Sequence, residues 1–296
     1  MIKSFFDKHN IEYKENASLK NYNTYKIDAI SDFIIFPKNE DELIIILKEL
    51  EKNKIRYLFL GNGSNVIFSK SYFKGVIIKL DNFNMVEYND TLVTVGAGFS
   101  LIKLAMETID KGLSGLEFAA GIPGCVGAST AMNAGAYNSD MASVVKSVKV
   151  LTPNLDIKTF ENKELEFSYR DSFLKRNKNY VVLSTTFELS QGDTEAMKKQ
   201  VVERRMKRFA SQPLNIPSAG SVFRNPDNMY AGELIEKLNL KGYRVGDAEV
   251  SEKHANFIVN VGNATGNDVI ELIKKIKKEV KSKYNVELKL EQIIIE

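Results

Sequence analysis

The chain has 296 residues, of which 44% are hydrophobic and 27% charged, and its formal net charge is +3. This composition is ordinary for a globular protein, the length allows two domains, and the small charge argues against nucleic-acid binding. One cysteine, Cys125, excludes an internal disulfide, and no apolar run reaches the ~20 residues that span a bilayer. Two histidines, His9 and His254, leave no His/Cys cluster for zinc, and no metal is expected. We expect a cytoplasmic monomer without membrane insertion.

The chain order of predicted elements favours an α+β fold with mixed sheets. Residues 1–16 predict a short amphipathic helix and a tether. Residues 30–80 predict a β-α-β-β unit, whose helix is capped by Asn39 and opens with acidic residues that match the helix dipole. Further strands are expected at 91–95, 144–151, 157–160, 180–189, 255–261 and 287–295. Further helices are expected at 101–111, 193–211, 231–238 and 267–284.

Six of the 18 glycines lie between positions 112 and 135. We expect the stretch Gly115–Tyr137 to be neither a regular helix nor a strand, because glycine permits positive φ and close approach. Successive free N–H groups in such a loop bind anions, so the stretch predicts a cradle for a diphosphate. The alternative is a long turn between core elements.

A second glycine-rich loop, Gly61–Asn65, follows a predicted strand and offers donors at Asn62, Ser64 and Asn65. It lacks the third glycine of a dinucleotide-binding fingerprint and the Gly-Lys-Ser/Thr of a P-loop. Alone it would be uninformative. Together, the two loops are expected to hold two parts of one extended nucleotide.

Several other residues allow both a structural and a functional interpretation. Arg170 and Asp171 form either a solvated ion pair or a site where Arg170 binds a carboxylate or phosphate. Ser221 follows a glycine in a small-residue loop that would otherwise be a turn. Cys125 is expected to be a small buried loop residue rather than a nucleophile. Glu291 is expected on the strand 287–295, on the face of its apolar residues, where a carboxylate needs a role or a partner.

Seven segments, in this order, resemble the UDP-N-acetylenolpyruvoylglucosamine reductase family, flavoenzymes of peptidoglycan precursor synthesis, over residues 20–296. They are Asn23-Thr24-Tyr25, Gly61-Asn62-Gly63-Ser64-Asn65, Gly121-Ile122-Pro123-Gly124, Met132-Asn133-Ala134-Gly135-Ala136-Tyr137, Tyr169-Arg170-Asp171-Ser172, Gly220-Ser221-Val222-Phe223-Arg224-Asn225-Pro226 and Ser251-Glu252-Lys253-His254. The short link between Arg170 and Ser221 is similar to the branch that lacks a substrate-capping insertion. Cys125 and Ala128 stand where the family usually has Thr and Gly, and the Arg usual two residues after Glu291 is absent.

The resemblance implies an FAD-binding PCMH-type domain of two subdomains at 17–194 and a C-terminal α+β substrate-binding domain at 195–296. It implies an NADPH-dependent enzyme with non-covalent FAD that reduces UDP-N-acetylglucosamine enolpyruvate, a UDP-sugar, to UDP-N-acetylmuramate. The implied catalytic residues are Arg170, Ser221 and Glu291. The implied substrate-binding residues are Tyr169, Arg224, Asn225 and His254. The implied FAD-binding residues are Asn23, Thr24, Gly61, Asn62, Gly63, Ser64, Asn65, Gly121, Ile122, Gly124, Asn133, Gly135 and Ala136.

The chemistry of this reaction suits these residue types. Hydride addition to the vinyl carbon leaves negative charge that spreads into the adjacent carboxylate, where a fixed cation such as Arg170 stabilises it. Ser221 would then donate a proton to the α carbon. Two alternatives are an FAD-dependent oxidase of the same fold class and a non-enzymatic nucleotide-binding protein.

Overall fold

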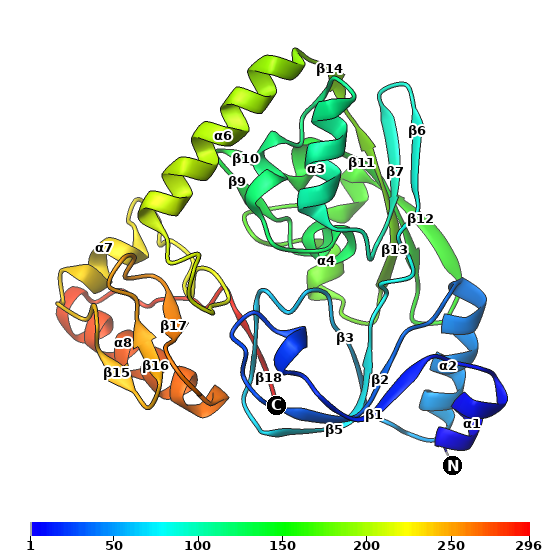
Figure 1. Cartoon of the computed structure of the whole chain (residues 1–296), viewed down its shortest axis with the longest axis horizontal. Helices are drawn as coiled ribbons and strands as arrows, with labels where there is room; N and C mark the ends of the chain where they lie inside the picture. Colours follow the sequence, from blue (N-terminus) through cyan, green and yellow to red (C-terminus); the bar gives the residue numbers. More distant parts are fainter. Residues whose placement is uncertain (1) are drawn as a thin grey trace. The chain divides into compact units, whose positions relative to one another are not determined.

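The computed structural model describes residues 2–296, so Met1 of the predicted N-terminal segment lies outside it. The chain divides into two compact units. Unit 1 holds the described residues up to Lys14, together with Ile34–Gly61 and Val76–Arg205, and unit 2 holds Glu15–Phe33, Asn62–Gly75 and Met206–Glu296. Both contain helices and strands, which confirms the α+β class (Figure 1).

Unit 1 is built around a five-stranded antiparallel sheet in the order β12-β11-β13-β7-β6. Helix α3 (Leu101–Asp110), capped by Ser100, and helix α4 (Val126–Ala131) pack with this sheet around one apolar core (Figure 1). Thr130 of α4 shares a buried hydrogen bond with Thr185 of β13, with 3.0 Å between the hydroxyl oxygens. The strands are β6 (Val86–Asn89), β7 (Leu92–Gly96), β11 (Val145–Leu151), β12 (Ile157–Glu161) and β13 (Val181–Glu188).

A four-stranded sheet has the order β1-β2-β5-β3, and three of its strands contain residues of both units. Its strands are β1 (Tyr13–Ser18), β2 (Ile30–Ile35), β3 (Tyr57–Phe59) and β5 (Tyr72–Ile78). In unit 1, α2 (Glu40–Lys52) begins at the expected cap, where the Asn39 side chain accepts from the N–H of Glu42 at 2.9 Å. Short helix α1 (Ile2–Lys8) buries Phe6.

Unit 2 contains the antiparallel sheet β15-β16-β17 and the parallel pair β4–β18. Its longest wholly contained helix, α8 (Gly266–Tyr284), has a Thr265 capping box and buries one apolar face. The other elements of this unit are β4 (Val66–Phe68), α7 (Ala231–Glu236), β15 (Arg244–Val245), β16 (Ala248–Val250), β17 (Ile258–Asn260) and β18 (Ile293–Ile295). Helix α6 (Thr194–Ser211) contains residues of both units.

The remaining elements are short. They are η1 (Lys20–Tyr22), β8 (Leu113–Ser114), η2 (Glu117–Gly121), β9 (Gly135–Ala136), β10 (Ser139–Asp140), η3 (Met141–Ser143), η4 (Asn162–Leu165), α5 (Phe173–Arg176) and β14 (Ser190–Gln191).

Several secondary-structure expectations need correction. The expected tether ends in strand β1, and β6 was not anticipated. The glycine-rich stretch contains α4, because the N–H groups of Val126 and Gly127 bond to the carbonyls of Phe99 and Ala97, and small residues then complete a helical turn. The last strand covers only its final three expected residues, since the segment before it makes isolated backbone contacts instead of a continuous ladder.

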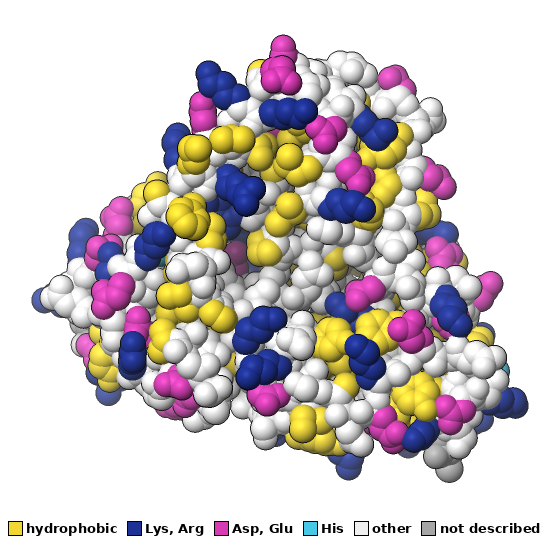
Figure 2. Space-filling model, viewed as in Figure 1, with side chains coloured by type: hydrophobic (Ala, Val, Ile, Leu, Met, Phe, Trp, Pro, Cys, Tyr) yellow, Lys and Arg dark blue, Asp and Glu magenta, His cyan; other side chains and the backbone are white. Residues whose placement is uncertain are grey.

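Acidic and basic side chains are interspersed over the face shown in Figure 2, in keeping with the small net charge. No helix within residues 2–296 is long and apolar enough to cross a membrane.

Candidate active site

The loop Asn62–Asn65 of unit 2 presents its backbone as hydrogen-bond donors. None of residues 2–296 accepts a hydrogen bond from the four N–H groups of this loop. Gly63 adopts φ +63°, and a Cβ there would lie 2.1 Å from the carbonyl oxygen of Tyr22. The N–H of Thr24 donates to the Gly63 carbonyl at 3.1 Å, which fixes the turn. A run of unsatisfied N–H groups on a fixed turn is the anion-binding arrangement that the sequence predicted.

Asn23 supports this loop from within the protein. Its side chain is 2% exposed and makes three hydrogen bonds, to the carbonyls of Leu19 and Ile27 and from the N–H of Ile27. Both polar atoms of the side chain therefore have protein partners. Through these hydrogen bonds, Asn23 stabilises the segment that contacts Gly63.

Gly61, the last residue of unit 1 before this loop, lies against the second glycine-rich stretch. A Cβ at Gly61 would lie 2.9 Å from Cys125 Sγ and 3.2 Å from Ala128 Cβ. The carbonyl of Gly61 accepts from Lys79 Nζ at 2.8 Å, and Lys79 also pairs with Asp81 at 3.1 Å. Burial raises the pKa of the Cys125 thiol, which fits a packing residue rather than a nucleophile.

In the second glycine-rich stretch, Gly115–Tyr137, several N–H groups donate to backbone carbonyls of the protein. Ile122 donates to the Ala119 carbonyl at 3.0 Å, and Val126 donates to the carbonyl of Phe99 at 2.9 Å. A Cβ at Gly124 would lie 2.8 Å from Ser129 Oγ. Gly121 closes the short helix η2 just before Ile122. Glycine in this stretch therefore permits close packing. Within residues 2–296, the loop with free N–H donors is Asn62–Asn65.

Asn133 organises the hairpin that follows. It has φ +45° and is 1% exposed; its Nδ2 donates to Asp140 Oδ2 at 3.1 Å and to the Ser168 carbonyl at 2.8 Å. Its Oδ1 accepts from the N–H of Ala142 at 3.0 Å. The hairpin strand Gly135–Ala136 pairs with β10, and Asn133 thus links this hairpin to the turn that carries Arg170.

Arg170 lies at the tip of a tight turn in which Ser168 and Asp171 exchange two backbone hydrogen bonds of 3.0 Å. Its backbone has φ +56°, and its Nη2 donates to the carbonyl of Gly135 at 2.6 Å. The guanidinium carbon lies 5.2 Å from the ring centroid of Tyr169, which is 55% exposed. The turn therefore presents an oriented cation beside an accessible aromatic ring.

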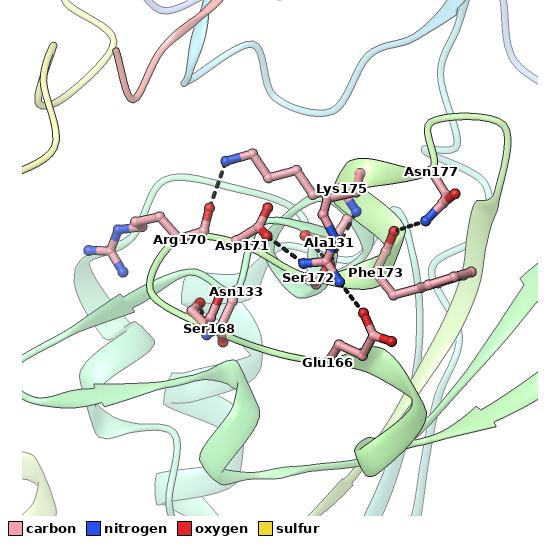
Figure 3. Close-up of polar contacts among 11 residues, drawn as sticks. Ala131, Asn133, Glu166, Ser168, Arg170, Asp171, Ser172, Phe173, Lys175 and Asn177 are labelled. Carbon is pink, nitrogen blue, oxygen red and sulfur yellow. Dashed lines mark hydrogen bonds and ion pairs between the residues drawn. The ribbon is translucent and has the colours of Figure 1, made fainter. Parts of the chain in front are cut away.

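The neighbouring charges of this turn are held apart from the Arg170 guanidinium, which points away from them in Figure 3. Asp171 pairs with Arg176 at 2.5 Å, and Arg176 also pairs with Glu166. Lys175 Nζ donates to the carbonyl of Arg170 at 2.6 Å. Asp171 thus has an arginine partner other than its sequence neighbour.

In unit 2, hydrogen bonds connect Glu291 to the segment that follows Ser221 and to the first loop. Ser221 forms an isolated bridge with Phe257, and the N–H of Glu291 donates to the carbonyl of Val222 at 2.9 Å. Asn65 Nδ2 donates to the Glu291 carbonyl at 3.2 Å. The prediction that Glu291 lies on a strand is wrong, because the strand ladder begins at Ile293. Its neighbour Gln292 is buried, with an exposed fraction of 4%.

A pocket of about 420 Å³ in unit 2 brings together three predicted site residues, Ser221, Asn225 and His254. Asn225 Oδ1 accepts from the N–H of Ala231 at the start of α7, at 3.1 Å. The N–H of Arg224 donates to the carbonyl of Lys289 at 2.9 Å, and Arg224 is not among the lining residues. The pocket is lined by Ser211, Ser221, Asn225, Tyr230, Gly232, Glu233, Glu236, Lys253, His254, Ala255 and Asn256.

His254 is uncharged in this pocket at neutral pH. Its pKa is lowered, mainly by burial and also by the nearby charge of Lys241. Its Nδ1 accepts from the N–H of Asn256 at 3.2 Å, so the ring proton lies on Nε2. His254 is therefore a hydrogen-bond donor to the pocket.

Sequence reasoning missed the residues that hold these groups in place. Asn256 bonds to both the N–H and the carbonyl of Phe223, at 3.0 and 2.8 Å, and so fixes the segment after Ser221. Gln292 Nε2 donates to the carbonyls of Ala219 and Gly220, at 3.0 and 3.2 Å. The signal that points to Asn256 and Gln292 is their burial, because a buried amide needs hydrogen-bond partners.

These features define an α+β protein with a donor-rich loop that suits the diphosphate of a dinucleotide, and with a separate polar pocket. No group of three or more His, Cys, Asp or Glu within residues 2–296 could hold a metal ion. Residues 31–160 match the model of an FAD-binding domain, and residues 212–295 match that of the C-terminal domain of UDP-N-acetylenolpyruvoylglucosamine reductase. The protein is an FAD-binding flavoprotein.

Known relatives extend this match to nearly the whole chain. A UDP-N-acetylenolpyruvoylglucosamine reductase from Bacillus pumilus is 42% identical over 95% of this chain and 93% of the relative. The one from Anoxybacillus flavithermus is 43% identical over 95% and 94%. A crystal structure of the Thermus caldophilus reductase matches with a TM-score of 0.81 and 32% identity, over 97% of this chain and 99% of the other. The chain belongs to the UDP-N-acetylenolpyruvoylglucosamine reductase family, which confirms the resemblance.

Proposed function

We propose that this protein reduces the enolpyruvyl group of UDP-N-acetylglucosamine enolpyruvate to give UDP-N-acetylmuramate, in the synthesis of peptidoglycan precursors. The observation that carries the proposal is the pocket that contains Ser221, Asn225 and His254 in a chain of this family. FAD is the cofactor, and NADPH is proposed as its reductant. Residues 17–194 are proposed as the FAD-binding part and residues 195–296 as the substrate-binding part.

The donor-rich loop supports FAD binding by this chain. The four N–H groups of Asn62–Asn65 would hold the diphosphate, while Thr24 and Asn23 keep the loop in shape. When bound, reduced FAD supplies the hydride that the vinyl carbon of the substrate accepts. Gly61, Gly121, Ile122, Gly124, Asn133, Gly135 and Ala136 are proposed as further FAD-binding residues.

Arg170 is proposed to stabilise the charge that develops on the substrate carboxylate. Its orientation by the Gly135 carbonyl supports this role, because a fixed cation needs no reorganisation as charge develops. Tyr169, Arg224, Asn225 and His254 are proposed to contact the substrate. A neutral His254 with its proton on Nε2 suits hydrogen bonding to a sugar or phosphate oxygen.

Ser221 is proposed to donate the proton to the α carbon, with Glu291 as the third catalytic residue. Ser221 lines the pocket, and the backbone hydrogen bond between Glu291 and Val222 fixes their two segments together. A serine hydroxyl is a weak acid, so it works only toward a strongly basic carbon. Cytoplasmic location and a monomeric state remain predictions.

Anaerobic half-reactions test the proposal. The purified protein should be yellow, acid precipitation should release the flavin, NADPH should bleach it, and the enolpyruvyl substrate should restore the colour. Ser221→Ala should keep bleaching by NADPH while turnover falls by about 10²–10⁴-fold, and Ser221→Cys should recover part of the loss. Reduction by a simple alcohol would favour the oxidase alternative. Bound flavin that NADPH leaves oxidised would favour the non-enzymatic one.

A further inference from the structure

A buried lysine of unit 1 contacts Gly61, the residue before the diphosphate loop, at a position that no motif singled out. Lys79 directly follows β5, and its side chain is 6% exposed. Its N–H donates to the carbonyl of Ile35 at 3.0 Å, which fixes its backbone between two strands. Burial of an ammonium group is costly unless other groups stabilise its charge.

Lys79 Nζ is directed at the backbone of Gly61, which precedes the loop. It donates to the carbonyl of Gly61 at 2.8 Å and pairs with Asp81 at 3.1 Å, and the Asp81 side chain is 52% exposed. An exposed carboxylate is screened by water, so it offsets a buried positive charge only in part. The Lys79 ammonium group is therefore held at the carbonyl of Gly61.

The bond to Gly61 also sets the direction of a donor. In a planar trans peptide, the C=O of Gly61 and the N–H of Asn62 point to opposite sides of the chain. Lys79 holds the oxygen, so the N–H of Asn62 points away from Lys79, and none of residues 2–296 accepts a hydrogen bond from it. A cation on the carbonyl polarises the amide and strengthens this donor.

The contacts of Gly61 keep the peptide in this position. A Cβ at Gly61 would lie 2.9 Å from Cys125 Sγ and 3.2 Å from Ala128 Cβ, so the backbone is packed tightly here. The Gly61 peptide is thus confined by α4 and held by the ammonium group of Lys79.

We propose that Lys79 is a positioning residue for FAD, which orients and polarises the Gly61–Asn62 peptide so that the N–H of Asn62 donates to the diphosphate. This inference rests on the FAD-binding function proposed above. It predicts that Lys79 matters more for the affinity of FAD than for the stability of the FAD-free protein.

Flavin fluorescence during titration of the FAD-free full chain gives the test. Lys79→Met should raise the Kd of FAD at least about tenfold, about 1.4 kcal/mol of binding free energy, while the Tm of the FAD-free protein stays within about 2 °C. Asp81→Asn removes the competing carboxylate and should leave FAD bound as tightly or more tightly. Lys146→Met is the matched control, because Lys146 also forms an ion pair in unit 1, with Glu188 at 3.3 Å, and its side chain is 41% exposed.

Several results would overturn the inference. They are a Kd for Lys79→Met within threefold of wild type, or an equal loss of affinity in Asp81→Asn or Lys146→Met. If Lys79→Met does not fold, Lys79→Gln keeps an N–H donor without the charge, and it should show the same loss; unchanged affinity there would also refute the idea. Wild-type protein that takes up no FAD would refute the proposed function instead, so the two failures are distinguishable.

Discussion

Replacing Gln292 by leucine tests whether a buried amide holds the Ser221 segment in place. Gln292 Oε1 accepts from the hydroxyl of Tyr25 at 3.1 Å, and its Nε2 donates to the carbonyls of Ala219 and Gly220. Leucine has a similar size, so the change removes these hydrogen bonds with little loss of packing. It leaves the Tyr25 hydroxyl, which is fully buried, and two carbonyls without this partner.

Each buried polar group left unsatisfied costs about 1–3 kcal/mol. Gly220 is only partly buried and contributes less, so we expect Gln292→Leu to lower the free energy of unfolding by about 3–5 kcal/mol. For 296 residues, an unfolding entropy of about 0.6 kcal/mol/K converts this into a Tm lower by roughly 5–8 °C. Because Gly220 precedes Ser221, turnover should fall as well, while bleaching of the flavin by NADPH persists.

Differential scanning calorimetry of the FAD-free protein measures the stability effect. Gln200→Leu on α6 is the matched control, since Gln200 is exposed and should change stability by less than about 0.5 kcal/mol. In Tyr25→Phe/Gln292→Leu, the hydroxyl is no longer left unpaired, so the double variant should lose at least about 1 kcal/mol less than the sum of the single variants. A Tm for Gln292→Leu within 2 °C of wild type, or strict additivity, would refute the reasoning.

Three further predictions use other residues. Burial raises the pKa of Tyr25 above its unfolded value, so its contribution to stability is complete below about pH 10 and is lost as pH rises further. Tyr25→Phe should therefore flatten the alkaline loss of stability in thermal melts from pH 9 to 11, and an unchanged slope would contradict this prediction. Arg170→Lys keeps the charge but loses the planar donor. Stopped-flow absorbance should show normal bleaching of the flavin by NADPH and at least about tenfold slower recovery of its colour with substrate. Equal losses in both half-reactions would indicate a structural arginine. Gly63→Ala combines strained φ with a Cβ 2.1 Å from a carbonyl oxygen, so FAD should bind at least about tenfold more weakly. Gly112→Ala, with its nearest atoms at 3.7 Å, should lose only stability, about 1–2 kcal/mol. Equal Kd values of FAD for the two variants in titrations would contradict this prediction.

Local chemical signals in the sequence determined much of this protein. Asn39 and Ser100 start helices because their side chains accept from N–H groups three residues on, wherever the helix later packs. The donor-rich loop could be predicted because Gly63 permits a positive φ that few other residues adopt. The order of short motifs was specific enough to indicate the family before any contact was known.

Only the tertiary structure decided which side chains hold these motifs. Tyr25 and Gln292 are 267 positions apart, and Lys79 reaches back 18 positions to the Gly61 carbonyl. Such bonds depend on where packing brings two backbones together, and no local pattern encodes that distance. The segment before Ile293 illustrates the same limit: its apolar residues suggested a strand, but a strand forms only where a neighbouring backbone offers a continuous row of partners.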